Sequence, residues 1–271
     1  MPGLRRCIWR LTMGSRRRGR LPGRGWWIAA LALVAAGLAG AETMTTRTVM
    51  PGTPYETVVY VKQGETPGPS VFVMGGCHGD EVAGYLAADR LVGWTITRGT
   101  LVLLPRAHVA AIKRNARGWP GNMNAMFPGK ADGSDMERLA YAIWQEMKTA
   151  KPELVVTLHE SRTFYRADPN GYGQTLTHDF TELNPLFQPV LDATNPRIAN
   201  PDHRFAIKVA PFATCPTYNA VRWLKCPATS IETCRQLGLQ TRITHHLLIL
   251  RAMLSRWGME WTEGCRMGEG E

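Results

Sequence analysis

The chain has 271 residues, which is room for one large domain or two small ones. Hydrophobic residues make up 44% of it and charged residues 20%, a globular composition that excludes intrinsically disordered and fibrous classes. The net charge of +10 first points to a nucleic-acid or membrane partner, but eight arginines within residues 1–41 supply most of it. The remaining residues include 24 basic and 22 acidic side chains, so we expect no nucleic-acid partner.

The first 41 residues have the features of a targeting signal. An arginine-rich stretch over residues 1–25 precedes fifteen uncharged residues, 26–40, and Ala39-Gly40-Ala41 is a small-x-small pattern typical of a signal-peptidase site. The apolar run is shorter than the roughly 20 residues that a transmembrane helix needs. We therefore predict a signal peptide over residues 1–41 and an exported protein, periplasmic or secreted, that meets the membrane only through this segment. An uncleaved anchor is the alternative.

Predicted strands and helices alternate in the first half of the remaining chain. Three continuously apolar runs, SVFVM, TLVLL and LVVTL, are typical of strands buried on both faces. In chain order we expect a polar lead-in over 42–55, strands over 57–61 and 70–74, a helix over 81–92, a strand over 100–104, a helical stretch up to residue 114, a loop over 115–134, an amphipathic helix over 135–149 and a strand over 154–158.

The second half is less regular. We expect an irregular polar segment over 160–200 that covers the substrate, short strands over 204–209 and 228–231, a closing helix over 241–257 and a fraying tail over 262–271. The alternation predicts one domain over residues 42–271 with an α/β fold, a mostly parallel or mixed twisted sheet and helices on both faces. Ligands of such sheets bind beyond the carboxyl ends of the strands, so residues following each strand are candidates for the site.

Removal of Cys7 with the signal peptide would leave five cysteines, an odd number that excludes complete intramolecular pairing. In an oxidising compartment we expect a disulfide between Cys215 and Cys226, with Cys234 and Cys265 as a second candidate pair. Cys77 follows an apolar strand and is expected to be a buried thiol. No C-x-x-C spacing occurs, which argues against a cysteine-based zinc site.

Three side chains at strand ends form a candidate metal site. His78 and Glu81 lie three residues apart in the turn after strand 70–74, and His159 follows strand 154–158. Two histidines and one carboxylate are the ligand set of a catalytic zinc ion whose fourth position is open for water. Taken singly, the first pair also fits a surface turn with a helix-capping acid, and His159 also fits a core histidine.

Glu232 follows the predicted strand 228–231, where an acid is awkward unless it faces a cleft. It could take a proton from a water molecule on the zinc ion and pass it to the leaving nitrogen. An edge residue paired with Arg235 is the alternative.

Four motifs in this order resemble the succinylglutamate desuccinylase/aspartoacylase family, which is related to the zinc carboxypeptidases. They are GGCHGDE (75–81), NMNAMFPG (122–129), VVTLHES (155–161) and SIET (230–233), and the resemblance extends from about Val71 to Leu254. It implies that His78, Glu81 and His159 bind one Zn²⁺ per chain and that Glu232 is the catalytic acid and base. The implied fold is the phosphorylase/hydrolase-like α/β sandwich of the carboxypeptidases.

The middle motif departs from the family pattern. Asn124 matches the asparagine that binds the substrate carboxylate, and Arg117 matches the arginine that polarises the scissile carbonyl, with Arg114 as its rival. Ala125 replaces the arginine that pairs with the carboxylate. Another cation is therefore expected to replace it, or the substrate has no carboxylate there. The candidates are Arg162, Arg166, Lys130 and Arg114, of which we favour the first two.

The leading interpretation is an exported zinc-dependent hydrolase of amide bonds, an N-acyl amino acid deacylase whose substrate is a small acylated amino acid or short peptide. A zinc carboxypeptidase or amidase acting on cell-wall peptides is the alternative, because export would take the protein to such peptides. A non-catalytic, zinc-containing ligand-binding protein is a third possibility, against which Glu232 argues, because a binding protein needs no acid beside the metal.

Overall fold

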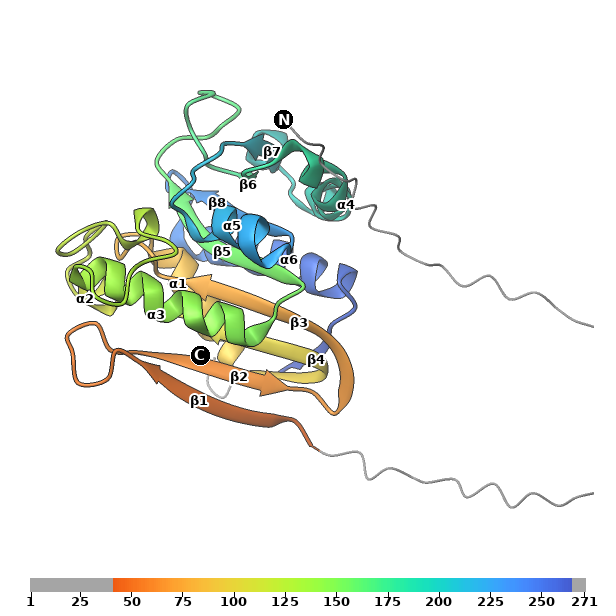
Figure 1. Cartoon of the computed structure of the whole chain (residues 1–271). Coiled ribbons are helices and arrows are strands. Elements are labelled where there is room, and N and C mark those ends of the chain that lie inside the picture. The colour runs from red at the N-terminus through yellow and green to blue at the C-terminus, as the bar shows by residue number, and fades with distance from the viewer. Residues whose placement is uncertain (1–40, 265–271) are drawn as a thin grey trace, which may run out of the picture. The chain divides into compact units, whose positions relative to one another are not determined.

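The strands of the described residues, 41–264, join in one mixed sheet in the computed structural model (Figure 1). Its order is β1-β2-β4-β3-β5-β8-β6-β7, with β9 paired to β4. The strands are β1 (Thr43–Val49), β2 (Thr57–Gln63), β3 (Thr66–Gly75), β4 (Trp94–Leu104), β5 (Leu154–Ser161), β6 (Thr175–His178), β7 (Ala206–Val209), β8 (Ala228–Cys234) and β9 (Glu260–Glu263).

The centre of the sheet is parallel and its flanks are antiparallel. Strands β4, β3, β5 and β8 run in parallel, whereas β2 and β9 pair antiparallel with β4, and β6 pairs antiparallel with β8. The carboxyl ends of β3, β5 and β8 therefore meet at one edge, where loops from neighbouring strands come together. This mixed sheet confirms the predicted α/β class.

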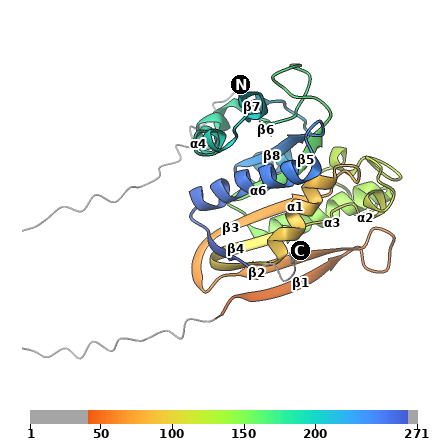
Figure 2. The same cartoon turned by 180° about the vertical axis from the view of Figure 1, so that it is seen from behind.

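Helices cover both faces of the sheet. On one face lie α1, α4 and α6, and on the other α3 and α5, as opposite views show (Figures 1 and 2). The helices are α1 (Val82–Val92), α2 (Val109–Ile112), α3 (Asp135–Ala150), α4 (Asn184–Thr194), α5 (Pro216–Asn219) and α6 (Leu239–Arg256). No helix within residues 41–264 has the length and hydropathy needed to cross a bilayer.

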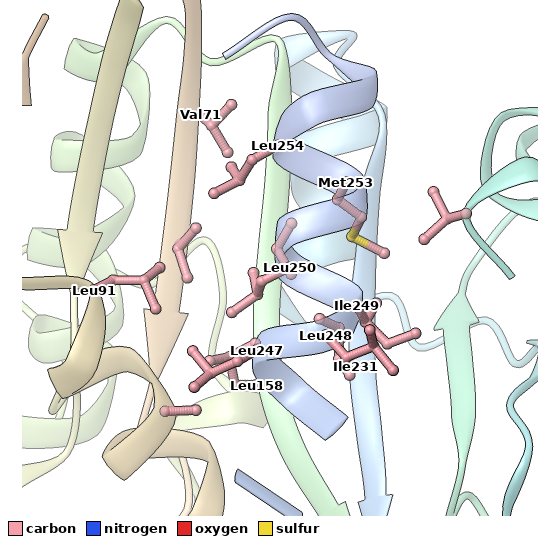
Figure 3. Close-up of a cluster of buried hydrophobic side chains, with 14 of the residues drawn as sticks. Val71, Leu91, Leu158, Ile231, Leu247, Leu248, Ile249, Leu250, Met253 and Leu254 are labelled. Carbon is pink, nitrogen blue, oxygen red and sulfur yellow. The ribbon is translucent and has the colours of Figure 1, made fainter. Parts of the chain in front are cut away.

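Continuously apolar strands serve two hydrophobic cores. In β3, Val71 and Val73 pack into the core under α1 and α6, while Phe72 and Met74 pack into the core under α3. Residues from α6 reach the first core beside Val71 and Leu158 (Figure 3). Alternation of side chains across a strand explains why Val71–Met74 contains no polar residue: both faces are covered.

Three segments differ from the sequence-based expectation. The lead-in over 42–55 contains β1, whose side chains are mostly exposed because it pairs with β2 along one edge only. The segment over 160–200 contains β6 and α4, although α4 carries Pro189 inside it, a residue that breaks helical patterns. Strand β9 overlaps the start of the expected tail.

The predicted disulfide between Cys215 and Cys226 is wrong, because both are free, buried thiols. Cys215 caps the N-terminus of α5 and its Sγ lies 3.0 Å from Thr217 Oγ1, whereas Cys226 packs in the core under α3. The two thiols therefore have separate environments. Cys77 is a buried free thiol, as expected. Cys234 is also free, and its candidate partner Cys265 lies outside the described residues.

Candidate metal centre and substrate cavity

The turn after β3 places His78 and Glu81 beside each other. Gly76 adopts a φ of +70°, and a Cβ on Gly79 would meet the backbone carbonyl carbon of Ala111 at 2.1 Å, so both positions require glycine. His78 Nδ1 lies 2.7 Å from Glu81 Oε1. This turn thus brings the first two predicted ligands together at the N-terminus of α1.

His159 completes the cluster from the neighbouring strand. Strand β5 continues to Ser161, so His159 and Glu160 point to opposite faces of the sheet. His159 Nδ1 lies 2.7 Å from Glu81 Oε2, and one ligand atom from each of the three residues lies within 4.8 Å of the others. All three side chains are buried. The convergence expected for a metal site is therefore present.

The electrostatics of the cluster centre on the Glu81 carboxylate. Burial alone would raise the pKa of Glu81, but the charges of His78 and His159 and their hydrogen bonds outweigh it and hold that pKa below its usual range. Burial lowers the pKa of His78. Burial also acts to lower the pKa of His159, but Glu81 outweighs it and raises that pKa well above the usual value. The cluster therefore stabilises positive charge next to a buried carboxylate, as a cation site requires.

Glu232 lies across from His159 in the register of β5 and β8, and its side chain lines the same cavity. Burial raises the pKa of Glu232 to about 7, against the lowering effect of His159. A carboxyl group with such a pKa can both accept and return a proton near neutral pH. The alternative pairing of Glu232 with Arg235 is not observed, because Arg235 Nη1 donates to Asp80 Oδ2 at 3.1 Å.

Two polar neighbours of the cluster, Asn122 and Arg235, were not assigned to it by sequence reasoning. Asn122 Oδ1 lies 3.1 Å from His78 Nε2, and Arg235 Nη2 lies 3.9 Å from Glu81 Oε1. The signal for Asn122 was its place in the motif 122–129, where only Asn124 was considered. Arg235 follows Glu232 by three residues, at the carboxyl end of β8. The rule that ligands bind at strand ends could therefore have identified it.

Glu160 supports the cluster from the other face of the sheet. Its Oε2 accepts a hydrogen bond from the Ala83 backbone nitrogen at 3.0 Å, and its Oε1 pairs with Arg242 of α6. These contacts tie the start of α1, which carries Glu81, to the strand that carries His159. Glu160 is therefore a positioning residue for the two ligands.

A cavity of about 730 Å³ opens beside the cluster. Its walls combine the ends of β3, β5 and β8 with the segments before and after β6 and the start of α5. Of the predicted site residues, it is lined by His78, Glu81, Arg117, Asn124, His159, Arg162 and Glu232. Arg117 Nη1 donates to Glu81 Oε1 at 3.0 Å, which places its guanidinium at the cluster.

Of the four cations considered as replacements at Ala125, the cavity contains Arg162. Arg166 points elsewhere, because its Nε donates to the Arg204 carbonyl oxygen at 3.3 Å. Lys130 pairs with Glu137 at 3.0 Å, and Arg114 stacks over the Trp119 ring. The prediction of Arg166 as a substrate contact therefore has no geometric support, because its guanidinium lies on the neighbouring loop rather than in the cavity.

The loop that carries Arg162 is fastened to β7. Lys208 Nζ lies 4.6 Å from the ring centroid of Tyr165 and 4.5 Å from that of Tyr172, and it donates to the Pro169 carbonyl oxygen at 2.6 Å. Cation–π contacts of this kind hold an exposed loop with modest strength. The Arg162 side chain itself is exposed at the cavity rim.

Residues 67–167 match the model of the succinylglutamate desuccinylase/aspartoacylase catalytic domain, a range that contains His78, Glu81 and His159 and ends before Glu232. Over 89 residues, 31% of this chain, the sequence is 36% identical to the N-alpha-acetyl-L-2,4-diaminobutyric acid deacetylase of Halomonas elongata, of which it covers 25%.

Solved structures share the fold over most of the chain. The apo form of the cell shape determinant Csd4 of Helicobacter pylori superimposes with a TM-score of 0.67 at 19% identity, over 84% of this chain and 57% of that one. A succinylglutamate desuccinylase of Silicibacter superimposes with a TM-score of 0.62 at 18% identity, over 83% of this chain and 69% of that one. The chain thus spans a quarter of the curated relative and little more than half of Csd4.

Proposed function

We propose that this chain, which over residues 67–167 belongs to the succinylglutamate desuccinylase/aspartoacylase family, is a zinc-dependent hydrolase that removes acyl groups from amino acids. The observation that carries the proposal is the convergence of His78, Glu81 and His159 beside Glu232 in one cavity. His78 and Glu81 follow β3, whereas His159 and Glu232 lie near the carboxyl ends of β5 and β8, so the arrangement brings together residues that are far apart in the sequence.

The three residues of the cluster fit a zinc ion. Two imidazoles and one carboxylate form a known catalytic ligand set for zinc, and histidine is tuned by the polar atoms around it. The buried Glu81 carboxylate also supports the assignment, because it lies 2.7 Å from both His78 Nδ1 and His159 Nδ1 and brings a negative charge to the place where a cation would bind. When bound, zinc would polarise a carbonyl group and lower the pKa of water.

Proton transfer falls to Glu232 in this proposal. Its raised pKa lets it take a proton from the attacking water and give it to the departing amine nitrogen near neutral pH. Its position opposite His159 in the β5–β8 register fixes it at the cluster. Arg117 and Arg235 bring positive charge to the same place, where negative charge develops on the carbonyl oxygen during attack.

Arg162 is proposed to bind a substrate carboxylate together with Asn124. Both line the cavity, and the Arg162 side chain is exposed there, with no salt bridge to another residue within 41–264. A guanidinium pairs with a carboxylate through two parallel hydrogen bonds, so Arg162 can replace the cation that Ala125 lacks. The role of Arg117 in polarising the carbonyl, like that of Arg162, remains a proposal.

The deacylase is favoured over the carboxypeptidase because the sequence relative is a deacetylase of an N-acetylated amino acid. Csd4 is described as a D,L-carboxypeptidase and was solved with a tripeptide, but its low sequence identity supports the fold alone.

Export by residues 1–41 is part of the proposal and would bring cell-wall peptides within reach. N-terminal sequencing of exported material should begin at or near Glu42, and a mature chain that retains Trp26 would mean an anchor.

Hydrolysis assays with the zinc-loaded chain test the function. A panel of N-acetyl and N-succinyl amino acids should be hydrolysed, with release of the free amine, and muropeptides should react less well. Preferred cleavage of muropeptides would establish the carboxypeptidase alternative. A zinc-loaded chain that binds these compounds but hydrolyses none of them would indicate the non-catalytic binding protein.

A further inference from the structure

Asp179 is a charged side chain of the cavity that the proposed chemistry does not use. It lies directly after β6 and is 4% exposed. The other two buried acids of the cavity have cationic or histidine partners: Glu81 lies beside the two histidines and Arg117, and Glu160 pairs with Arg242. Within residues 41–264, Asp179 has no such partner.

Neutral donors hold the Asp179 carboxylate in place. The Phe212 backbone nitrogen donates to Oδ1 at 2.8 Å and Thr217 Oγ1 donates to Oδ2 at 2.9 Å, while Cys215 Sγ lies 3.7 and 3.8 Å from the two oxygens. A carboxylate has about four acceptor positions, so these contacts leave capacity for a further donor. Burial raises the pKa of Asp179, as expected for an acid without a cation.

Asp179 lies in line with Glu232 along the floor of the cavity. Strand β6 pairs antiparallel with β8, so that Thr175 is opposite Glu232 and Thr177 is opposite Ser230. Side chains two residues apart share a face of a strand, which puts Thr175, Thr177 and Asp179 in one row. Four residues of strand correspond to about 13 Å, so a ligand reaching from Glu232 to Asp179 must be extended.

We infer that Asp179 binds an ammonium or guanidinium group of the substrate, at the end of the cavity away from the metal cluster. A buried carboxylate surrounded by neutral donors is costly, and a cationic ligand group offsets that cost through charge-assisted hydrogen bonds. The cavity thus presents the Arg162 guanidinium at its rim and, at Asp179, a buried carboxylate that has no cationic partner within residues 41–264. The substrate class is therefore an acylated amino acid or peptide that bears both a carboxylate and a free amino group. This inference rests on the proposed function.

A structural role is the competing explanation, because Asp179 also joins the end of β6 to the start of α5. The two roles separate in Thr217→Val, which removes one neutral donor but keeps the carboxylate. If Asp179 only anchors α5, Thr217→Val and Asp179→Asn should change ligand preference alike. If Asp179 binds a cation, the preference should be lost in Asp179→Asn and kept in Thr217→Val.

The experiment compares two ligands whose side chains share the same four-carbon chain. Nα-acetyl-lysine carries the ammonium group and Nα-acetyl-norleucine lacks it. The wild-type protein should prefer the lysine compound by about tenfold or more in kcat/KM, as one charge-assisted hydrogen bond provides. Asp179→Asn should reduce the ratio to about one, whereas Asp192→Asn, on the exposed side of α4, should leave it unchanged. Thermal unfolding of each variant checks that it is folded.

Calorimetric binding of lysine and norleucine to the zinc-loaded protein separates this inference from the proposed function. If no acylated amino acid is hydrolysed but lysine binds more tightly in an Asp179-dependent way, the function is wrong and the inference stands. If hydrolysis occurs and the wild-type protein does not distinguish the two ligands, the inference is overturned. If Asp179→Asn fails to fold, the comparison of lysine and norleucine with the wild-type protein still tests the inference.

Discussion

The metal cluster and the substrate wall of the same cavity are built differently. His78, Glu81, His159 and Glu232 lie on or directly after strands that are fixed by the central sheet, and three of them form a closed set of contacts. The wall formed by residues 160–217 consists largely of loops, short strands and helices, and the Arg162 side chain at its rim is exposed. A rigid centre for chemistry thus adjoins a wall that is free to vary with the substrate.

The difference predicts that substitutions at the centre affect turnover and those in the wall affect binding. The largest effect is expected for Glu232→Gln, because glutamine keeps the size of the side chain but cannot accept a proton. Turnover by the zinc-loaded variant should fall 10²–10⁴-fold, a typical loss for a general base, with metal content unchanged. Steady-state kinetics beside metal analysis measures both. Near-normal kcat would assign the proton transfer to another residue.

A smaller, binding-type effect is expected for Arg162→Ala. Loss of a guanidinium that pairs with a carboxylate should raise KM for an acidic substrate about tenfold and leave kcat and zinc content close to those of the parent. Arg166→Ala is the matched control, since that side chain contacts the Arg204 carbonyl oxygen outside the cavity. If both variants and the parent have the same KM and kcat, Arg162 does not bind the substrate. Neutral amides or esters should then be tested as substrates.

The buried side chain of His246 predicts that the stability of the folded protein depends on pH. Burial lowers the pKa of His246 to about 3, whereas an unfolded histidine has a pKa of about 6.5. The unfolded state therefore binds a proton that the folded state does not between these values, so stability is complete above about pH 6.5 and falls as the pH drops towards 3. The slope from this group is about 1.4 kcal/mol per pH unit.

Urea unfolding at pH 7, 6 and 5 measures this effect. His246→Gln removes the titrating group and can keep the contact with Thr233 Oγ1, so its free energy of unfolding should depend less on pH than that of the parent. His203→Gln, at a partly exposed position, should follow the parent. Parallel curves for the parent and His246→Gln would contradict the assignment of a neutral, buried His246.

The same contrast explains how far the sequence predicts this site. The continuous apolar runs identified the central strands, and the rule that ligands bind at strand ends then pointed to His78, His159 and Glu232. Strand periodicity also accounts for the orientation of Glu160, which points away from His159. These predictions depend on a regular sheet, in which one residue fixes the direction of the next.

The wall could not be predicted in this way. Arg162 and Arg166 are both loop arginines, and the choice between them depends on a loop path that Lys208 fixes from β7. Asp179 lies after β6, a strand of four residues within a segment that was expected to be irregular. Because β6 was not predicted, the rule on strand ends could not identify Asp179. The free thiol of Cys215 likewise depends on tertiary contacts with α5 that no spacing reveals.

The most direct test of the account is the zinc content of the purified chain, compared with that of His159→Ala and of His203→Gln. Plasma mass spectrometry after dialysis against zinc should find one zinc per chain in the parent and in His203→Gln. His159→Ala should lose the metal, because two ligands cannot hold it in a site built for three. A parent chain that binds no zinc, or a His159→Ala variant that retains it fully, would contradict the central claim.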